Sequence, residues 1–236
     1  MRAGTLYGIS VGPGDPELIS LKGLRRLQQA DVVAFPARVG GKPGMAQQIV
    51  APWLAPEQQQ LPLHFPYVRA SDVLNRAWRA AAERVWQPLQ RGQSVAFACE
   101  GDVGFYSTFA YLAATLQQHY PQASVEAVPG VCSPLAAAAA TGEPLVEGDR
   151  CLAVLPALYA PDRLEAALAW ADTLVLLKAG SVYPQLWDAL QAKQLLARSC
   201  AIERVGWPQQ RLYCDLRERR QLQLSYFSLL IVWARP

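Results

Sequence analysis

Three short turns carry the residue types with the clearest potential for chemistry. The first, GPGDPE, follows an apolar run and places Asp15 between two prolines. The second, EGD, holds Glu100, Gly101 and Asp102, and the third is VPGVCS, which contains Cys132. Glycine permits close approach of a backbone, proline fixes φ, and the carboxylates add negative charge. Such turns suit a cationic or uncharged ligand group better than a phosphate.

The spacing in the first turn argues against two familiar nucleotide-binding loops. A dinucleotide loop needs G-x-G-x-x-G at the start of a helix, but no third glycine follows Gly12 and Gly14. A Walker loop, G-x-x-x-x-G-K-[ST], occurs nowhere in the chain. Common Rossmann-like methyltransferases need an acid at the end of the second strand, where this chain has Phe35-Pro36. Taken alone, the turn remains open to a second interpretation, a stiff connection without a ligand.

Short β-rich runs alternate with helical patterns and would position these turns. A helix is expected over 20–29, where Ser20 can act as the N-cap, and another over the alanine run 135–140. Near-continuous apolar strands separated by helices predict a largely parallel sheet covered on both faces. The expected strands are 5–10, 32–35, 94–99, 125–128, 151–155, 173–177, 200–202, 212–214 and 227–233.

A fourth strand end, LLKAG, joins the three turns in this pattern. Ligands of doubly wound sheets collect at the carboxyl ends of strands, so four such ends can converge on one crevice. The polar, Gly/Pro-containing segment 141–150 is a plausible boundary between two αβ lobes, 1–142 and 143–236. Closer strands after this boundary predict more antiparallel pairing in the second lobe. The segment 40–44 and the Pro/Gln-rich stretch 51–66 are interpreted as surface loops around a short helix.

Composition limits the class of protein. With 52% apolar and 17% charged residues, the chain is expected to fold as a globular protein, and its net charge of +3 is too small to indicate nucleic acid binding. No apolar run has the length of a membrane span and no signal-peptide pattern is seen, so a cytoplasmic location is the default expectation. His64 and His119 stand apart from other likely ligands, which argues against a metal site or a histidine triad. Free, buried thiols are expected for all five cysteines, Cys99, Cys132, Cys151, Cys200 and Cys214.

Four segments, in this order, resemble the tetrapyrrole methylases, the superfamily of cobalamin and siroheme methyltransferases. They are GISVGPGDPELISLKGLRRLQQADVV, EGDVGFYSTFAYL, VPGVCS and LLKAG, and the resemblance covers nearly the whole chain. Within the family, CEGDVGFYSTFAYL, LAVLPA and YFSLLIV are most similar to the branch that methylates C-20 of precorrin-2 or cobalt-precorrin-2. Two alternatives remain: a family member with another target carbon or a macromolecular target, and a non-catalytic αβ module that binds a nucleotide-like ligand.

The resemblance implies a fold, a cofactor and an assembly. The fold is α/β, with two αβ domains of the non-Rossmann methyltransferase type and the cofactor cleft between them. The N-terminal domain would face the tetrapyrrole, and the C-terminal domain would complete a site for S-adenosylmethionine, with S-adenosylhomocysteine as product. The resemblance implies a homodimer, whereas the expectation of no nucleic acid or membrane partner rests on the composition. By position, the implied cofactor-binding residues are Pro13, Glu100, Gly101, Asp102, Phe105, Cys132, Ser133, Lys178, Ala179, Val205 and Ser228.

The implied reaction is an in-line displacement in which a meso carbon of the reduced tetrapyrrole attacks the sulfonium methyl. Such a carbon is electron-rich, so positioning can supply most of the catalysis and no side-chain nucleophile or metal is required. Asp15 and Asp102 are the candidates for a base. The substrate carboxylates favour cationic side chains at the open face of the cleft, first Arg38 and Lys42 and then Lys178.

Overall fold

The chain divides after Cys132 into two units, each built on its own five-stranded sheet. The computed structural model describes residues 3–37, 43–66, 70–156 and 160–235. Met1–Cys132 form the first unit and Ser133–Pro236 the second. The helix α5 (Ser133–Thr141) therefore groups with the second unit, whereas the sequence had placed the boundary after residue 142.

The first sheet is entirely parallel, as the apolar runs predicted. Its strand order is β3-β2-β4-β1-β5, so β1 lies between β4 and β5 and the ends of these three strands are neighbours. Consecutive parallel strands need crossover connections, which the helices supply. The strands are β1 (Thr5–Ser10), β2 (Val32–Ala37), β3 (Gln59–His64), β4 (Val95–Cys99) and β5 (Ser124–Val128).

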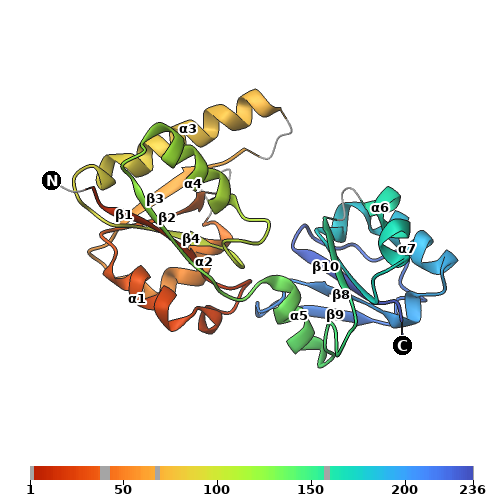
Figure 1. Cartoon of the computed structure of the whole chain (residues 1–236). Helices are drawn as coiled ribbons and strands as arrows, with labels where there is room; N and C mark the ends of the chain where they lie inside the picture. Colours follow the sequence, from red (N-terminus) through yellow and green to blue (C-terminus); the bar gives the residue numbers. More distant parts are fainter. Residues whose placement is uncertain (1–2, 38–42, 67–69, 157–159, 236) are drawn as a thin grey trace. The chain divides into compact units, whose positions relative to one another are not determined.

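Helices cover both faces of this sheet. In Figure 1, α1 and α2 lie on one face and α3 and α4 on the other. The predicted cap is confirmed, because Ser20 Oγ accepts a hydrogen bond from Gly23 N (3.1 Å) at the start of α1. Phe97 of β4 and Leu112 of α4 are fully buried in the core between the sheet and the second helix pair. The helices are α1 (Leu21–Gln29), α2 (Met45–Val50), α3 (Ser71–Leu89) and α4 (Thr108–His119), with 3-10 turns η1 (Pro16–Leu18) and η2 (Ala51–Trp53).

A short helix, α2, lies between the segments 40–44 and 51–66 as expected, but the strand β3 corrects the interpretation of 51–66 as loop. Residues 59–64 pair in parallel with β2 at the edge of the sheet. Leu61 and Leu63 are buried while Gln60, Pro62 and His64 are exposed, which is the period of two of a half-buried strand. Pro62 obscured this signal in the sequence; proline is tolerated here because an edge strand has N–H groups that face no neighbour.

The second sheet is mixed, which confirms the expectation of more antiparallel pairing. Its order is β6-β7-β10-β8-β9; β6 and β7 are parallel and the remaining pairs are antiparallel. The helices α6 and α7 lie together against it (Figure 1). The elements are β6 (Leu152–Pro156), β7 (Thr173–Leu177), β8 (Ser199–Glu203), β9 (Arg211–Cys214), β10 (Ser228–Trp233), α6 (Ala160–Leu168), α7 (Tyr183–Ala192), η4 (Ala179–Val182) and η5 (Leu196–Arg198).

The cysteines depart from the expectation of five free, buried thiols. Cys200 of β8 and Cys214 of β9 lie directly opposite each other and form a disulfide. Their separation of 14 residues in the sequence gave no hint of this contact, because the antiparallel pairing of the two strands brings them together. Cys99 is free and buried as expected, whereas Cys132 is half-buried and Cys151 is exposed.

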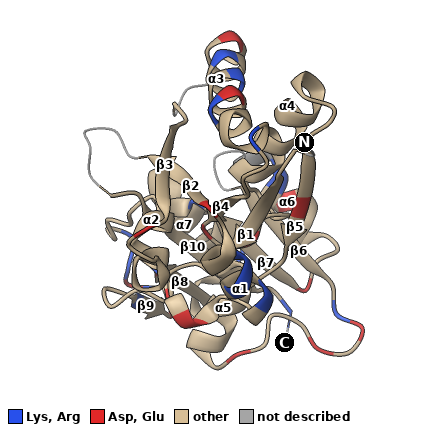
Figure 2. Ribbon diagram, turned by 90° about the vertical axis from the view of Figure 1, so that its left-hand side faces the viewer, with Lys and Arg blue, Asp and Glu red and all other residues tan. Residues whose placement is uncertain are grey.

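Charges of both signs are interspersed on the surface. Figure 2 shows a mixture of acidic and basic residues along α3, where Arg76 and Asp72 form an ion pair (3.1 Å). On the other face of the first sheet, Lys22 lies 2.7 Å from Glu126 of β5, and its hydrogen bond lowers the pKa of that carboxyl. Within the described ranges, no helix has the length and apolar character to cross a membrane, and no three His, Cys, Asp or Glu residues are grouped so as to hold a metal ion.

Candidate functional site

The turns that follow β1 and β4 are joined directly through their backbones. Gly12 N donates to Gly101 O (3.3 Å), and Gly101 N donates to Gly12 O (2.8 Å). Both glycines have left-handed backbones, with φ of +76° and +74°, a conformation that side-chain-bearing residues adopt only at a cost. Glycine therefore occupies both positions at which this pair of hydrogen bonds requires a left-handed backbone.

The Asp102 carboxylate ties these two turns to the third. Asp102 Oδ2 accepts hydrogen bonds from Ser10 Oγ (3.2 Å) and from Gly130 N (2.7 Å). Asp102 Oδ1 accepts from Gly104 N (2.8 Å), and Ser10 Oγ in turn accepts from Val103 N (2.9 Å). One side chain therefore holds the ends of β1, β4 and β5 together. We call these residues the Asp102 network.

Close packing around the network contrasts with an opening at Gly101. A Cβ atom at Gly130 would lie 2.6 Å from the Cβ of Ser10, and one at Gly8 of β1 would lie 2.3 Å from the Phe109 ring. At Gly101 a Cβ atom would meet no other heavy atom within 4 Å. The space beside the Gly101 Cα atom is therefore open to a ligand, while the glycines around it are closely packed.

The first turn is buried as far as Gly14, and Asp15 is half-buried at its exit. Pro13 lies in the buried part of this turn. Asp15 Oδ1 accepts from Glu17 N (2.9 Å) and so caps the 3-10 turn η1. Asp15 Oδ2 makes no hydrogen bond with any residue that the structure describes, which leaves it available to a ligand.

The remaining predicted residues of this region are half-buried: Glu100, Phe105, Cys132 and Ser133. Phe105 N donates to Asp102 O (3.2 Å), which closes the turn after β4. Behind it, Cys99 Sγ lies 3.0 Å from Ser107 Oγ, and burial raises the pKa of the Cys99 thiol to about 11. Cys132 is the last residue of the first unit and Ser133 begins α5.

The other predicted cofactor residues lie at one edge of the second sheet. Lys178 follows the end of β7, Val205 follows the end of β8, and Ser228 begins β10. Because β10 runs antiparallel to both neighbours, its first residue lies beside the last residues of β7 and β8, so the three positions lie at the same end of the strands. Ala179 and Val205 are buried, and Lys178 has a left-handed backbone (φ +58°) that turns the chain into η4.

Two residues at this edge were not singled out from the sequence. Ser225 Oγ is buried and has no hydrogen-bond partner among the described residues, although Ser225 N donates to a Glu203 carboxylate oxygen (2.8 Å). The ring of Tyr226 lies under Lys178 Nζ, 5.2 Å from the ammonium nitrogen. Their position just before the last strand was the only signal in the sequence. It was not sufficient, because a polar pair at the start of a strand has no distinctive spacing.

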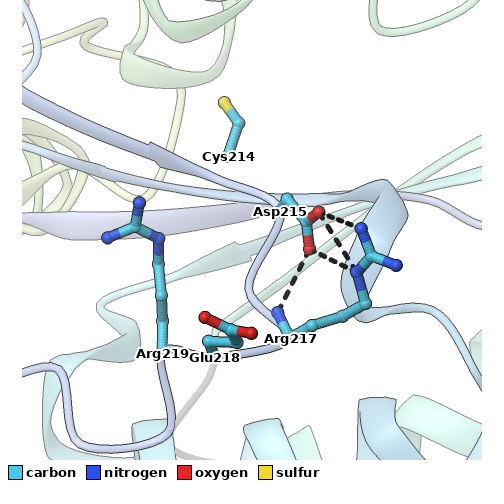
Figure 3. Close-up of a pocket in the computed structure, with 5 residues that line it drawn as sticks. All are labelled: Cys214, Asp215, Arg217, Glu218 and Arg219. Carbon is cyan, nitrogen blue, oxygen red and sulfur yellow. Dashed lines mark hydrogen bonds and ion pairs between the residues drawn. The ribbon is translucent and has the colours of Figure 1, made fainter.

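A hollow of about 580 Å³ lies over the turn after β9. In Figure 3, the Arg217 guanidinium faces the Asp215 carboxylate, with Nε 2.9 Å from Oδ1, and lowers the pKa of that carboxyl to about 2. The turn lies beside the first residues of β8. Lys178 and Ser228 lie at the other end of the strands of this sheet. Its two arginines are matched by two carboxylates, so it does not favour an anion and is no candidate for the cofactor. The residues that line it are Cys214, Asp215, Arg217, Glu218 and Arg219.

The two first candidates for substrate contacts, Arg38 and Lys42, lie outside the described residues. The third, Lys178, is half-buried at the edge of the second sheet. Its ammonium group lies over an aromatic ring, an arrangement that holds a cation without neutralising it. Of the proposed substrate contacts, the structure therefore describes only Lys178.

Comparisons with known proteins agree with the motifs. Residues 5–219 match the family of tetrapyrrole (corrin/porphyrin) methylases. The chain is 34% identical to a precorrin-2 C(20)-methyltransferase from Sinorhizobium sp, over 97% of this chain and 95% of that protein. It is 29% identical to a cobalt-precorrin-2 C(20)-methyltransferase from Salmonella typhimurium, over 97% and 96%. A uroporphyrin-III C-methyl transferase from Thermus thermophilus, solved with S-adenyl homocysteine, has the same fold (TM-score 0.66, 22% identity, 97% of both chains). The chain belongs to the tetrapyrrole methylase family.

Proposed function

We propose that this protein is an S-adenosylmethionine-dependent C-methyltransferase that methylates C-20 of precorrin-2 or of its cobalt-containing counterpart in cobalamin biosynthesis. The observation that carries the proposal is the 34% identity to the Sinorhizobium enzyme across nearly the full length of both chains. The Salmonella relative is named for the cobalt-containing substrate, so similarity alone leaves both forms of the substrate open.

The first unit offers groups that suit S-adenosylmethionine. The open space beside Gly101 lets a ligand approach this turn closely, and Asp15 Oδ2, which accepts no hydrogen bond from the described residues, can accept one from the ligand. We assign Pro13, Glu100, Gly101, Asp102, Phe105, Cys132 and Ser133 to this surface. In the second unit we assign Lys178, Ala179, Val205 and Ser228. Ser225 Oγ, which is buried without a hydrogen-bond partner among the described residues, is an added polar group. When bound, the cofactor supplies a methyl group made electrophilic by the sulfonium charge.

The role of the chain in the reaction is to position the reactants. The Asp102 network fixes three turns before any ligand arrives, so the site needs little rearrangement on binding. Holding two reactants in a near-attack geometry lowers a barrier by up to about 7–11 kcal/mol. This favours a mechanism without a side-chain nucleophile.

The two candidate bases have different environments. Both oxygens of Asp102 already accept hydrogen bonds, so we assign it a positioning role. Asp15 uses one oxygen for the cap and keeps the other, so it is the better candidate to accept the proton that the substrate carbon loses. Arg38 and Lys42 are proposed to bind substrate carboxylates. A homodimer in the cytoplasm is part of the same proposal.

Two measurements in sequence test the proposal. Isothermal titration calorimetry with S-adenosylhomocysteine is expected to show micromolar binding; no binding would refute the assignment as a methyltransferase. Incubation with S-adenosylmethionine and either precorrin-2 or cobalt-precorrin-2 is then expected to add the mass of one methyl substitution to at least one of them. If the protein binds the cofactor but modifies neither compound, the C-20 assignment is wrong and another target within the family must be sought.

A further inference from the structure

Tyr106 has a backbone conformation that its side chain does not favour. Its φ is +51°, in the left-handed region that glycine adopts at no steric cost. The residue lies between Phe105, which closes the turn after β4, and Ser107, whose Oγ caps α4 by accepting from Phe109 N (2.9 Å). The left-handed residue reverses the chain between the turn and the helix. A glycine would meet this need, so the presence of a tyrosine points to a use for the side chain.

The ring of Tyr106 is not needed to fill the core. It is 54% exposed, and it meets Phe105 edge to face at a centroid distance of 5.0 Å. On this face of the sheet the buried core is formed by side chains of the strands, α3 and α4, with Val103 from the same turn, and Tyr106 is not part of it. The chain thus accepts a disfavoured backbone in order to present a large aromatic ring at the surface.

The ring is presented beside the proposed site. Tyr106 is in the same turn as Asp102, which holds the ends of β1, β4 and β5 together, and Gly101 in that turn has open space beside it. The polar groups that suit a nucleoside and an amino acid come from the backbone and the carboxylates. A half-exposed aromatic face instead matches the apolar, conjugated ring of a tetrapyrrole, since aromatic faces attract such surfaces.

We propose that Tyr106 is a substrate-contacting residue whose ring positions the tetrapyrrole, separately from the residues that bind the cofactor. This inference rests on the proposed function for the identity of the substrate. It assigns to one side chain a part in substrate affinity and none in cofactor affinity.

The test compares Tyr106→Phe, Tyr106→Gly and Tyr106→Ala in the full chain. The Gly and Ala variants are expected to raise the KM for precorrin-2 about tenfold, the size of one lost aromatic contact, while kcat stays within about twofold. The Phe variant keeps the ring and is expected to resemble the wild type. The Kd of S-adenosylhomocysteine is expected to stay unchanged in all three variants.

The Gly and Ala pair separates a substrate contact from a structural role. Glycine suits the left-handed backbone and alanine does not, so the Gly variant is expected to have the higher Tm of the two. If the KM follows this difference in stability, or does not change in either variant, the inference is wrong. A loss of S-adenosylhomocysteine affinity equal to the loss for precorrin-2 would place the ring in the cofactor site and also overturn it.

Equilibrium binding keeps the inference distinct from the proposed function. The Kd of precorrin-2 is measured without cofactor by quenching of intrinsic fluorescence, for the wild type and Tyr106→Gly. A wild type that binds precorrin-2 but transfers no methyl group would refute the proposed function alone, and a weaker Kd for the variant would still support the role of Tyr106. A wild type that does not bind precorrin-2 would refute both.

Discussion

Replacing Asp102 by asparagine is expected to destabilise the first unit. The carboxylate accepts hydrogen bonds from Gly130 N (2.7 Å), Gly104 N (2.8 Å) and Ser10 Oγ (3.2 Å). Asparagine keeps one acceptor oxygen and replaces the other with an NH₂ group. In either orientation of the side chain, this NH₂ group faces one of the two backbone N–H donors, Gly104 N or Gly130 N. One hydrogen bond to a charged acceptor, about 1.5–3 kcal/mol, is then replaced by two donors that face each other.

We expect the free energy of unfolding to fall by about 2–3 kcal/mol in Asp102→Asn, because Asp102 is half-buried and water can satisfy part of what is lost. For a chain of this length this corresponds to a decrease in Tm of roughly 4–12 °C. Urea denaturation followed by tryptophan fluorescence measures the change. The affinity for S-adenosylhomocysteine is expected to fall with it, because the open backbone at Gly101 is held by the same network.

Asp15→Asn is the matched control. Asp15 also accepts a backbone hydrogen bond, but through one oxygen that asparagine retains, and asparagine caps as well as aspartate. We expect its stability to stay within about 0.5 kcal/mol of the wild type. If Asp102→Asn were as stable as Asp15→Asn, the carboxylate would not hold the three turns together and the account of a preorganised site would be wrong.

Three further perturbations test other parts of the structure. Gly130→Ala would put a Cβ atom 2.6 Å from that of Ser10, so the third turn must shift. We expect the free energy of unfolding in urea to fall by about 1–3 kcal/mol and S-adenosylhomocysteine to bind more weakly. An unchanged stability would contradict the close approach of Gly130 and Ser10. Burial raises the pKa of Cys99 to about 11, so the folded chain holds this proton more tightly than the unfolded chain; the resulting stability is present below about pH 8.5 and is lost toward pH 11. In a thiol titration at pH 8, exposed Cys151 should therefore react quickly and Cys99 only after unfolding; equal rates would contradict its burial. Cys214→Ser removes a disulfide that closes a loop with a sequence separation of 14 residues. We expect it to lower the free energy of unfolding by roughly 3 kcal/mol under oxidising conditions but only slightly when a reductant is present. An equal effect in both conditions would show that the bond does not form.

Much of the fold could be predicted because its signals are local. The apolar runs of β1 and β7 match the observed strands residue for residue, and Ser20 caps α1 as its position indicated. The edge strand β3 was missed because Pro62 and the glutamines around it resemble a loop by composition, and only the alternation of Leu61 and Leu63 reveals the strand.

The grouping of the three turns was predictable from the sequence, but the interactions that join them were not. Parallel strands place their carboxyl ends at one edge, so the three turns could be grouped from the sequence. The hydrogen bond from Ser10 to Asp102 spans 92 residues and depends on the strand order β4-β1-β5, which no local pattern specifies. The same limit explains the missed disulfide, since Cys200 and Cys214 meet only through the pairing of β8 with β9.

The proposed function requires methyl transfer to C-20 of the tetrapyrrole. The most direct test is to incubate the protein with precorrin-2 or cobalt-precorrin-2 and S-adenosylmethionine carrying a ¹³C-labelled methyl group, and to locate the label in the product by NMR. We expect one labelled methyl group, bonded to C-20, with an equal amount of S-adenosylhomocysteine released. A label at another carbon, or S-adenosylhomocysteine release without any labelled tetrapyrrole, would contradict the account.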